Sequence, residues 1–469
     1  RRRRNASVRA VLSFGALRPP SSARQPEGRD KTEAAMMTRR GFLSTGAAAG
    51  FAAFLPAVRA QALLTPPAGL IPIEQLPVRQ VDVPASNASG KLMLKGGGVA
   101  GRGSRWGMVV EIPPEPITAK LLWTAEKNMV PGVRLVLRGM KGPNGERPLL
   151  RGVVEVRDHT RGAIGAGLDL EGFDIEGDKV HDTVSSTLLR WVGLKDMRIR
   201  GGRNGLKLAP SPSLLSIVDS EIWRAAMGSG LYHNTYVNYV EAVEAVNTRF
   251  LSPWSDSNCF KCYAADVKVR GCTFANWWTE EDRQVGAVGG NALAEIGSWG
   301  NTVFIDNTLV RRMPMKPFML EFRNRIWQTG FDRYVPYWGI EPANYHSIDN
   351  SREDDPRLYR HLVARNHFVN GVLPDGSLDP GVRAKPGVAV LHGGTCVGWT
   401  SGLNGRKAKD GLGPTPPDWD IKHDRAIVYL AVNTQEGVPL ESWYSNHPVN
   451  HPQDPTPVRE LSEVPNWAG

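Results

Sequence analysis

The stretch Leu168-Asp-Leu-Glu-Gly-Phe-Asp-Ile175 contains the pattern that decides the fold. Apolar and polar residues alternate in it, as in a half-buried β-strand, and Gly172 interrupts the alternation with a turn. From Gly172 onward a short phrase recurs, made of a small or polar turn residue, two variable residues and a bulky apolar residue. The seven copies begin at Gly172, Asp196, Asp219, Asn247, Gly271, Asp306 and Arg365.

The spacing of these copies predicts a solenoid. Successive first residues differ by 24, 23, 28, 24, 35 and 59 positions, and a nearly constant period of this size is typical of stacked repeats. We interpret the interval of 35 as one period with a loop near residues 280–290, and the interval of 59 as two periods with an insertion near residues 330–355. The flanking segments have strand periodicity, so the sequence predicts an all-β fold, a parallel β-helix of about 9 to 12 coils.

Composition divides the rest of the chain. Residues 131–397 hold the repeats and form the expected β-helix. Residues 63–130 are rich in Pro and Gly, so we expect an irregular N-terminal cap that covers the first coil. Residues 398–469 combine Gly, Pro and charge with one clear strand, Arg425 to Thr434, and we expect a C-terminal tail packed on the solenoid.

The first 62 residues have the character of a targeting segment. In residues 36–62, the pair Arg39-Arg40 precedes an apolar, small-residue run, Gly41 to Ala57, which leads to Ala60 and Ala62. This order matches a bacterial twin-arginine signal peptide, and the run is too short for a spanning helix, which needs about 20 apolar residues. We therefore expect the export machinery as a partner of the precursor, a periplasmic or secreted mature protein without a membrane span, and a non-native or disordered leader at residues 1–35.

The distribution of charge argues against a nucleic-acid-binding protein, and the cysteines argue against a zinc or redox site. The net charge is +10, but residues 1–35 contribute +6 and residues 36–62 contribute +3, which leaves +1 for the remainder and predicts no nucleic-acid partner. Cys259, Cys262, Cys272 and Cys396 can form a disulfide, a redox pair or half of a zinc site, or can be buried thiols. We favour buried thiols, because no second ligand pair for zinc appears and no helix is expected beside the thiols to activate them.

Candidate functional residues lie at matching positions in neighbouring repeats. His233 lies 14 residues after Asp219, and Lys261 lies 14 residues after Asn247. We therefore expect the two side chains in one outward column on adjacent coils, about 5 Å apart. When turn length is allowed for, Lys207, Glu295 and Glu321 extend the same column.

This column has two interpretations. Alternating polar residues on the outside of a solenoid can simply avoid repulsion between neighbouring charges. Alternatively, the cations hold the carboxylates of an acidic polysaccharide, and a Lys crowded by a second cation serves as a general base. Trp254 and Trp299 can then supply flat apolar faces for sugar rings, or can instead close the core. A hydrolase would need paired carboxylates, for which Glu295 and Glu321 are the only obvious candidates.

The repeat and its column resemble the pectin-lyase-like right-handed β-helix superfamily over roughly residues 130–395. Locally, Phe260-Lys261-Cys262 and the segment Val267 to Phe274 are similar to the alginate lyase and chondroitinase B family. That resemblance implies Lys261 as catalytic base and Asp256 as an acidic calcium ligand. The chain departs from the family pattern at Cys262, where the family has Ser, at Trp254, where it has a second acidic ligand, and at residues 295–300, which contain no Arg.

Two functions follow from these observations. The first is a lyase that cleaves a uronate-containing polysaccharide by β-elimination, with Lys261 and His233 as candidate base and acid, substrate contacts from Lys207, Glu295, Glu321, Trp254 and Trp299, and Ca²⁺ at Asp256 as a possible cofactor. The alternative is a carbohydrate-binding or envelope-structural β-helix protein without catalysis.

Overall fold

The structure is a computed structural model of the whole chain. It describes residues 63–80, 91–94, 107–209, 211, 213–225, 232–254, 257–276, 292–298, 301–311, 319–322, 359–370, 390–392, 426–435, 438–439, 444–445 and 456–457. All of them belong to one compact unit, residues 58–469. The expected leader and signal peptide lie outside the described residues.

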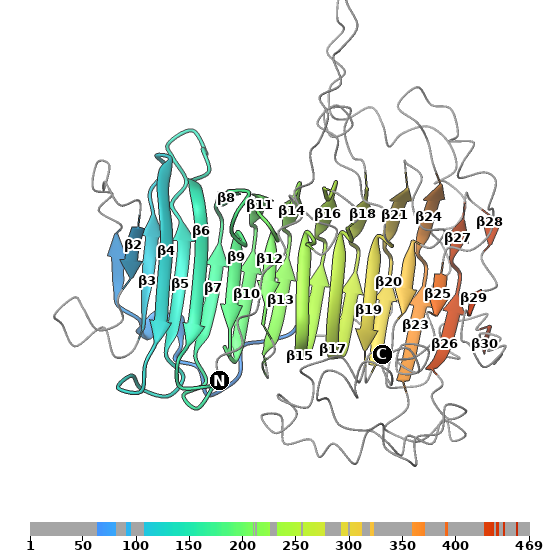
Figure 1. Cartoon of the computed structure of the whole chain (residues 1–469), viewed down its shortest axis with the longest axis horizontal. Helices are drawn as coiled ribbons and strands as arrows, with labels where there is room; N and C mark the ends of the chain where they lie inside the picture. The colour runs from blue at the N-terminus through green and yellow to red at the C-terminus, as the bar shows by residue number, and fades with distance from the viewer. Residues whose placement is uncertain are drawn as a thin grey trace, which may run out of the picture. The chain divides into compact units, whose positions relative to one another are not determined.

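The strands stack in three parallel columns, in which each strand pairs with the equivalent strand one coil earlier and one coil later (Figure 1). Column 1 contains β1 (Val78–Gln80), β3 (Gly107–Ile112), β5 (Arg134–Gly139), β7 (Gly167–Glu171), β10 (Trp191–Lys195), β13 (Leu214–Val218), the second half of β15 (Thr235–Val246) and of β17 (Phe260–Arg270), β20 (Asn301–Ile305), β23 (Tyr359–Ala364), β26 (Ala426–Ala431) and β30 (Thr456–Pro457). Column 2 contains the first residues of β4 (Ile117–Ala125) and β6 (Leu149–Asp158), then β8 (Asp174–Gly177), β11 (Arg198–Gly201), β14 (Glu221–Trp223), β16 (Arg249–Leu251), β18 (Thr273–Ala275), β21 (Thr308–Arg311), β24 (His367–Asn370) and β27 (Thr434–Gln435). Column 3 contains β2 (Lys91–Leu94), the remainder of β4 and β6, β9 (Val184–Thr187), β12 (Leu206–Leu208), the first half of β15 and of β17, β19 (Ala294–Ser298), β22 (Leu320–Phe322), β25 (Val390–His392) and β29 (Tyr444–Ser445).

This arrangement confirms the parallel β-helix. Among the described residues, the one antiparallel pair joins β27 to β28 (Val438–Pro439), and the one helix is the short 3₁₀ turn η1 (Ile73–Gln75). No helix in the described part of the chain is long and apolar enough to cross a membrane.

The register of column 1 reproduces the spacing of the sequence phrase. Pairing partners in successive coils from β7 to β23 are 24, 23, 28, 24, 35 and 59 positions apart. One interpretation is wrong: the interval of 59 is a single coil, because β20 pairs directly with β23, with Asn301 opposite Arg360. The extra residues are inserted within that coil, so they add no further strand to column 1.

The ladder also extends past both ends of the expected β-helix range, 131–397. At the N-terminal side, β1 pairs with β3 and β3 with β5, so part of the segment expected to be a cap already forms coils. At the C-terminal side, the expected strand is confirmed as β26, but it pairs with β23 and continues column 1 instead of packing outside it. A strand placed in the ladder pairs its backbone groups, which a strand lying outside would leave without ladder partners.

The recurring phrase marks the turn between columns 1 and 2. All seven first residues have positive φ, between 48° and 73°. Glycine adopts this left-handed region without a steric penalty, and Asn and Asp tolerate it better than other residues, which explains their recurrence at this position. An eighth turn of the same kind has Val432 at φ 55°, where the sequence lacks a recognisable turn residue.

Buried polar side chains stabilise these turns from inside. Asn307, Asn366 and Asn433 each follow a turn residue, and they stack on one another in successive coils. The Oδ1 atom of Asn366 accepts hydrogen bonds from the backbone N–H and from Nδ2 of Asn307, both at 2.9 Å. Asn433 Oδ1 accepts the same pair from Asn366, at 2.9 and 3.0 Å. This asparagine ladder satisfies backbone groups that the turn would otherwise leave buried without partners.

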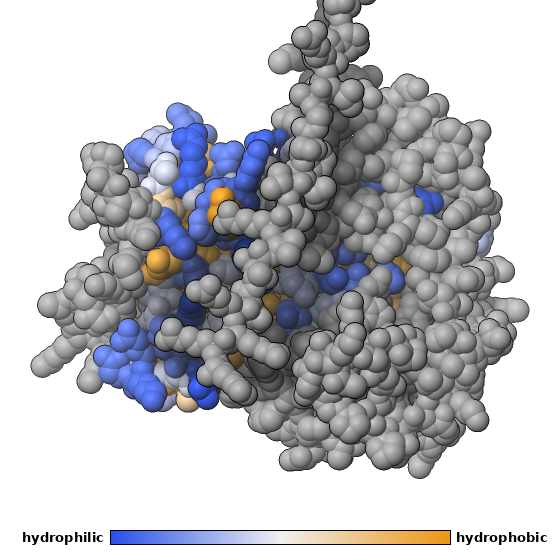
Figure 2. All heavy atoms as spheres, viewed as in Figure 1, coloured by the Kyte–Doolittle hydropathy of each residue, from blue (hydrophilic) through white to orange (hydrophobic). Residues whose placement is uncertain are grey.

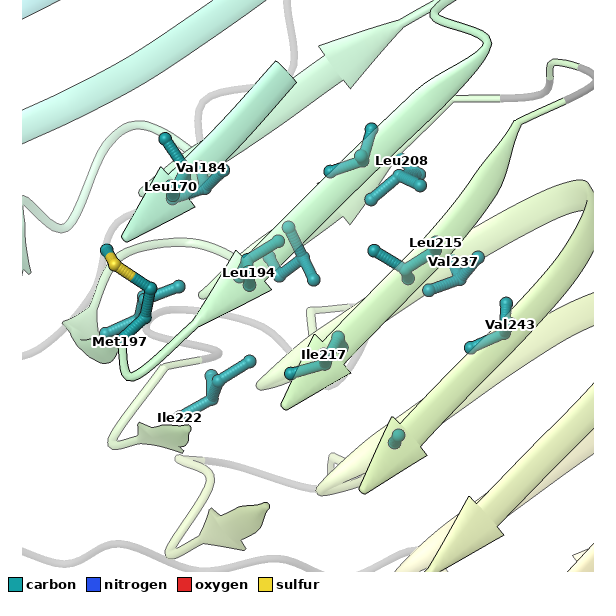
Figure 3. Close-up of a cluster of buried hydrophobic side chains, with 14 of the residues drawn as sticks. Leu170, Val184, Leu194, Met197, Leu208, Leu215, Ile217, Ile222, Val237 and Val243 are labelled. Atoms are coloured by element: carbon teal, nitrogen blue, oxygen red, sulfur yellow. The ribbon is translucent and has the colours of Figure 1, made fainter. Parts of the chain in front are cut away.

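The core fills the interior enclosed by the three columns. Leu194 of column 1, Ile222 of column 2 and Leu208 of column 3 point into the same buried cluster (Figure 3). The cluster continues along successive coils from Met108 to Leu430. On the face shown in Figure 2, by contrast, the described residues are mainly hydrophilic, with small apolar areas between them.

Part of the N-terminal segment lies along the outside of column 1. The backbone N–H of Leu64 donates a hydrogen bond to the carboxylate of Glu244, which is buried and also accepts from Arg270 Nη2 at 2.8 Å. Further along, Ile71 and Leu76 pack with Val109 and Val136 in a small outer cluster. Leu64, Ile71 and Leu76 are therefore held against the outside of column 1.

Candidate functional site

The predicted outward column exists and occupies column 3. We call it the column 3 row and define it as the register-paired residues Ser185, Lys207, Tyr236, Lys261, Glu295 and Glu321. The strand neighbours of Lys207, Lys261 and Glu295 are buried in the core, so these three side chains leave the opposite face of the sheet. Four of the five predicted members, namely Lys207, Lys261, Glu295 and Glu321, are confirmed in their register.

The fifth prediction is wrong, because Tyr236 and not His233 pairs with Lys261. Equal offsets from the phrase place two residues in one register only if the intervening turns have equal lengths. Eleven residues, 224–234, connect β14 to β15, whereas eight residues, 252–259, connect β16 to β17. The three extra residues place His233 before the strand and bring Tyr236 into the row.

Lys261 lies between a buried carboxylate and two aromatic rings. Its Nζ atom is 3.4 Å from Glu295 Oε1 and 5.8 Å from the ring centroids of both Tyr236 and Tyr263. The Tyr263 hydroxyl donates a hydrogen bond of 2.6 Å to the same Glu295 oxygen. The exposed fraction of the side chain is 16% for Lys261 and 2% for Glu295. Lys261 is thus a cation with a buried counter-ion, and only its outer part can meet a ligand.

Tyr236 occupies the centre of the row, between the two lysines. Burial raises the pKa of its hydroxyl to about 12, with a smaller contribution from the negative charge of Glu295. The hydroxyl therefore keeps its proton at neutral pH, and can donate a hydrogen bond or a proton but is not a ready base. The ring meets those of His233 and Tyr263 edge to face, with centroids 5.3 and 6.5 Å away.

His233 is buried behind Tyr236. Its backbone N–H donates to Asn204 Oδ1 at 2.8 Å, and its Nδ1 atom accepts a hydrogen bond from the backbone N–H of Asn258 at 3.2 Å. Because Nδ1 accepts, the neutral ring carries its proton on Nε2. His233 therefore links its own turn to the equivalent turns of the coils before and after it, and its ring contacts the row at Tyr236.

A second charged cluster, which we did not predict, lies at the Lys207 end of the row. The carboxylate of Asp182 accepts hydrogen bonds from Arg203 Nε at 3.1 Å, Arg203 Nη2 at 3.2 Å and Asn204 Nδ2 at 2.7 Å. Lys207 Nζ lies 3.3 Å from the same carboxylate. The guanidinium of Arg203 lies over the ring of Tyr232, 5.2 Å from its centroid.

These unpredicted residues have a positional signal in the sequence. Asp182, Arg203 and Tyr232 each come two or three residues before a strand of column 3, at the end of the preceding turn. Parallel coils bring equivalent turn ends to one edge, so polar residues at these places in adjacent repeats become neighbours. Finding them required the strand starts, which the turn phrase alone did not determine.

Three further predicted residues are Trp254, Trp299 and Asp256, and no described contact joins them to the column 3 row or to the Asp182 cluster. Trp254 lies half-buried in the turn after β16, and its backbone N–H donates to Ala225 O at 2.8 Å. Trp299 and Asp256 lie outside the described residues. Within the described ranges, no group of three or more His, Cys, Asp or Glu side chains is arranged to hold a metal ion.

Three of the four cysteines are buried free thiols, as predicted. Cys259, Cys262 and Cys272 are all in the core cluster. Burial raises the pKa of Cys272 to about 12, and it also raises the pKa values of Cys259 and Cys262. These thiols are unsuited to redox or nucleophilic chemistry. Cys396 lies outside the described residues.

Comparisons with known proteins give no family for this chain. No protein-family model matches it, and neither a curated protein nor a solved structure matches it. What the structure shows is the fold, a parallel β-helix with a row of two lysines, one tyrosine and two glutamates on the outside of column 3.

Proposed function

We propose that this protein binds an acidic polysaccharide along the column 3 row. The observation that carries the proposal is the register of Lys207, Tyr236 and Lys261, which puts two cations and an aromatic ring on the same face of three successive coils. Lysine cations form charge-assisted hydrogen bonds with carboxylates, and an aromatic side chain offers an apolar face to a sugar ring. Adjacent coils are about 4.8 Å apart, so the row offers a repeated set of contacts to a repeating polymer.

The binding experiment is calorimetric titration of the purified chain with polygalacturonate and alginate, with neutral dextran as the control polymer. We expect binding to both acidic polymers, weaker at high salt, and no binding to dextran. The Lys261→Gln variant should weaken binding by about tenfold, the effect of one charge-assisted contact. Arg198→Gln is the matched control, because Arg198 is an exposed cation on the outside of column 2.

Loss of Lys261 also removes the cation that lies 3.4 Å from the buried Glu295, so a folding control is needed. The double variant Lys261→Gln, Glu295→Gln removes both charges of this ion pair. Weakened binding in the double variant, with thermal unfolding near that of the parent chain, supports a direct role for Lys261. If the parent chain binds neither acidic polymer, the proposal fails.

β-Elimination at the same row is a second candidate function. The observation in its favour is that Lys261 and His233, the base and acid that the sequence predicts, both flank the Tyr236 ring. Lys261, once its amine has lost its proton, would take the proton from the carbon next to a uronate carboxylate. A carbon–carbon double bond would form as the glycosidic C–O bond breaks, and the leaving oxygen would take its proton from the Tyr236 hydroxyl, because His233 is buried behind that ring. The product absorbs ultraviolet light, so absorbance should rise with alginate, pectate or glycosaminoglycans, with or without calcium. If the absorbance does not change with any of these polymers, β-elimination is wrong and only the binding function remains.

We also propose that the protein is exported through the twin-arginine route. In support, the paired arginines at residues 39–40 precede an apolar run that ends near Ala60 and Ala62, and Leu64, two residues after Ala62, is hydrogen-bonded to Glu244 of the solenoid. Replacing both Arg39 and Arg40 by Lys should retain the precursor inside the cell, since the paired arginines are the recognised feature. N-terminal sequencing of exported protein tests the cleavage site, and export that persists in the Lys variant argues against this route.

A further inference from the structure

The two ends of the column 3 row differ in charge. At the Lys261 end, Lys261 is matched by the buried carboxylate of Glu295, and Glu321 adds another carboxylate one coil further on. At the other end, the carboxylate of Asp182 is shared by two cations, Arg203 and Lys207. Among these described groups, Arg203, Lys207 and Asp182 together carry one net positive charge, whereas the Lys261–Glu295 pair is neutral.

The exposure of these groups shows the same asymmetry. The exposed fraction of the side chain is 36% for Arg203 and 35% for Lys207, compared with 16% for Lys261. Asp182, which holds both cations, is 9% exposed and lies beneath them. The cations at this end thus keep surface available for a ligand, while the carboxylate that positions them is largely shielded.

The guanidinium of Arg203 is also oriented before any ligand arrives. Its Nε and Nη2 atoms donate to the two oxygens of Asp182, and its plane lies near the Tyr232 ring. Hydrogen bonding to Asp182 raises the pKa of Arg203, so its charge is permanent. A guanidinium held at one edge retains donors on its other nitrogen, and little side-chain entropy is lost when a carboxylate accepts from them.

From this geometry we infer that Arg203 and Lys207 form a carboxylate subsite, which holds a uronate carboxylate of the bound polysaccharide. This inference rests on the proposed binding function. It adds the position at which the carboxylate of the sugar is recognised. Asp182 is a positioning residue in this subsite, and Lys261 contacts the adjacent part of the sugar chain. Recognition of acid over ester then depends mainly on the Arg203 end of the row.

The test compares polygalacturonate with fully methyl-esterified polygalacturonate, which has the same backbone without the charges. Calorimetric titration of the purified chain gives the ratio of the two affinities. We expect the parent chain to prefer the acid form, and Arg203→Gln to reduce affinity for the acid form by about tenfold while leaving affinity for the ester nearly unchanged. Arg203→Lys keeps the positive charge but loses the planar guanidinium, so its affinity for the acid form should lie between those of the parent chain and Arg203→Gln. Arg198→Gln should behave as the parent chain.

The outcomes separate this inference from the binding function. If the parent chain binds polygalacturonate and Arg203→Gln keeps both the affinity and the preference for acid, the subsite is wrong and the binding function stands. If the parent chain binds neither polymer, the binding function itself is wrong, and the subsite with it. An equal loss of affinity for acid and ester in Arg203→Gln, with lowered thermal stability, would show a structural role and overturn the subsite.

Discussion

Asp182 is the residue on which the charged end of the row depends. Burial is the largest single influence on its carboxyl group and acts to raise the pKa, but hydrogen bonds from Arg203 and Asn204 and the charges of Lys207 and Arg203 outweigh it. The pKa of Asp182 therefore lies below its ordinary value. A carboxylate that is more acidic when folded contributes stability above its unfolded pKa, about 3.9, and loses that contribution as the pH falls through the folded pKa.

This gives a pH prediction for Asp182→Asn. The variant should be less stable than the parent chain at pH 7 and pH 5, by a similar amount, because the ionised carboxylate is fully present at both. Below about pH 4 the difference should shrink, since the parent carboxylate becomes protonated. Urea unfolding at pH 7, 5 and 3 measures the difference. A stability gap that is as large at pH 3 as at pH 7 contradicts the assignment.

The turn between columns 1 and 2 is the element that repeats most faithfully. Its phrase was readable in the sequence because each coil needs a residue that tolerates positive φ, and Gly, Asp and Asn meet that need at six of the seven predicted turns. The eighth turn escaped prediction because Val432 carries no such signal. The site was less predictable, because the length of the turn before column 3 varies. A three-residue difference was enough to exchange Tyr236 for His233 in the row.

Val432 offers a test of this turn. A β-branched residue at φ 55° is strained, by about 1–2 kcal/mol for the left-handed conformation, and its side chain is exposed, so little packing is lost on replacement. Val432→Asn should therefore raise the free energy of unfolding by about 1 kcal/mol. Val432→Ala, which keeps the Cβ atom, should gain less. Chemical unfolding of both variants measures the effect, and equal stability of the Asn variant and the parent chain argues against strain at this turn.

The asparagine ladder predicts a larger effect of opposite sign. Asn366→Ala removes the acceptor for the Asn307 N–H and the donor to Phe304 O, and it leaves these groups buried. Each buried polar group without a partner costs about 1–3 kcal/mol, so we expect destabilisation of about 3 kcal/mol. Thr273→Ala, a half-buried position on β18, is the control and should cost much less. A loss below about 0.5 kcal/mol for Asn366→Ala would mean that water replaces the ladder.

At the scale of the whole molecule, the proposed binding of an acidic polymer would depend on local charges. The formal charge of +10 belongs mostly to residues 1–62, and residues 63–469 carry only +1. A nearly neutral chain has no long-range field to collect an acidic polymer, so affinity has to come from the few charges arranged by the fold. The parallel register supplies that arrangement, since it aligns Lys207, Tyr236 and Lys261 from three repeats into one row.

The most direct test of this account is a crystal structure of the protein with an acidic oligosaccharide, such as an oligogalacturonate. We predict that the sugar chain lies along the outside of column 3, across Lys207, Tyr236 and Lys261, with one carboxylate within hydrogen-bond distance of Arg203. An oligosaccharide bound on another face, or a column 3 row left without ligand in crystals of a protein that binds the sugar in solution, would contradict the account.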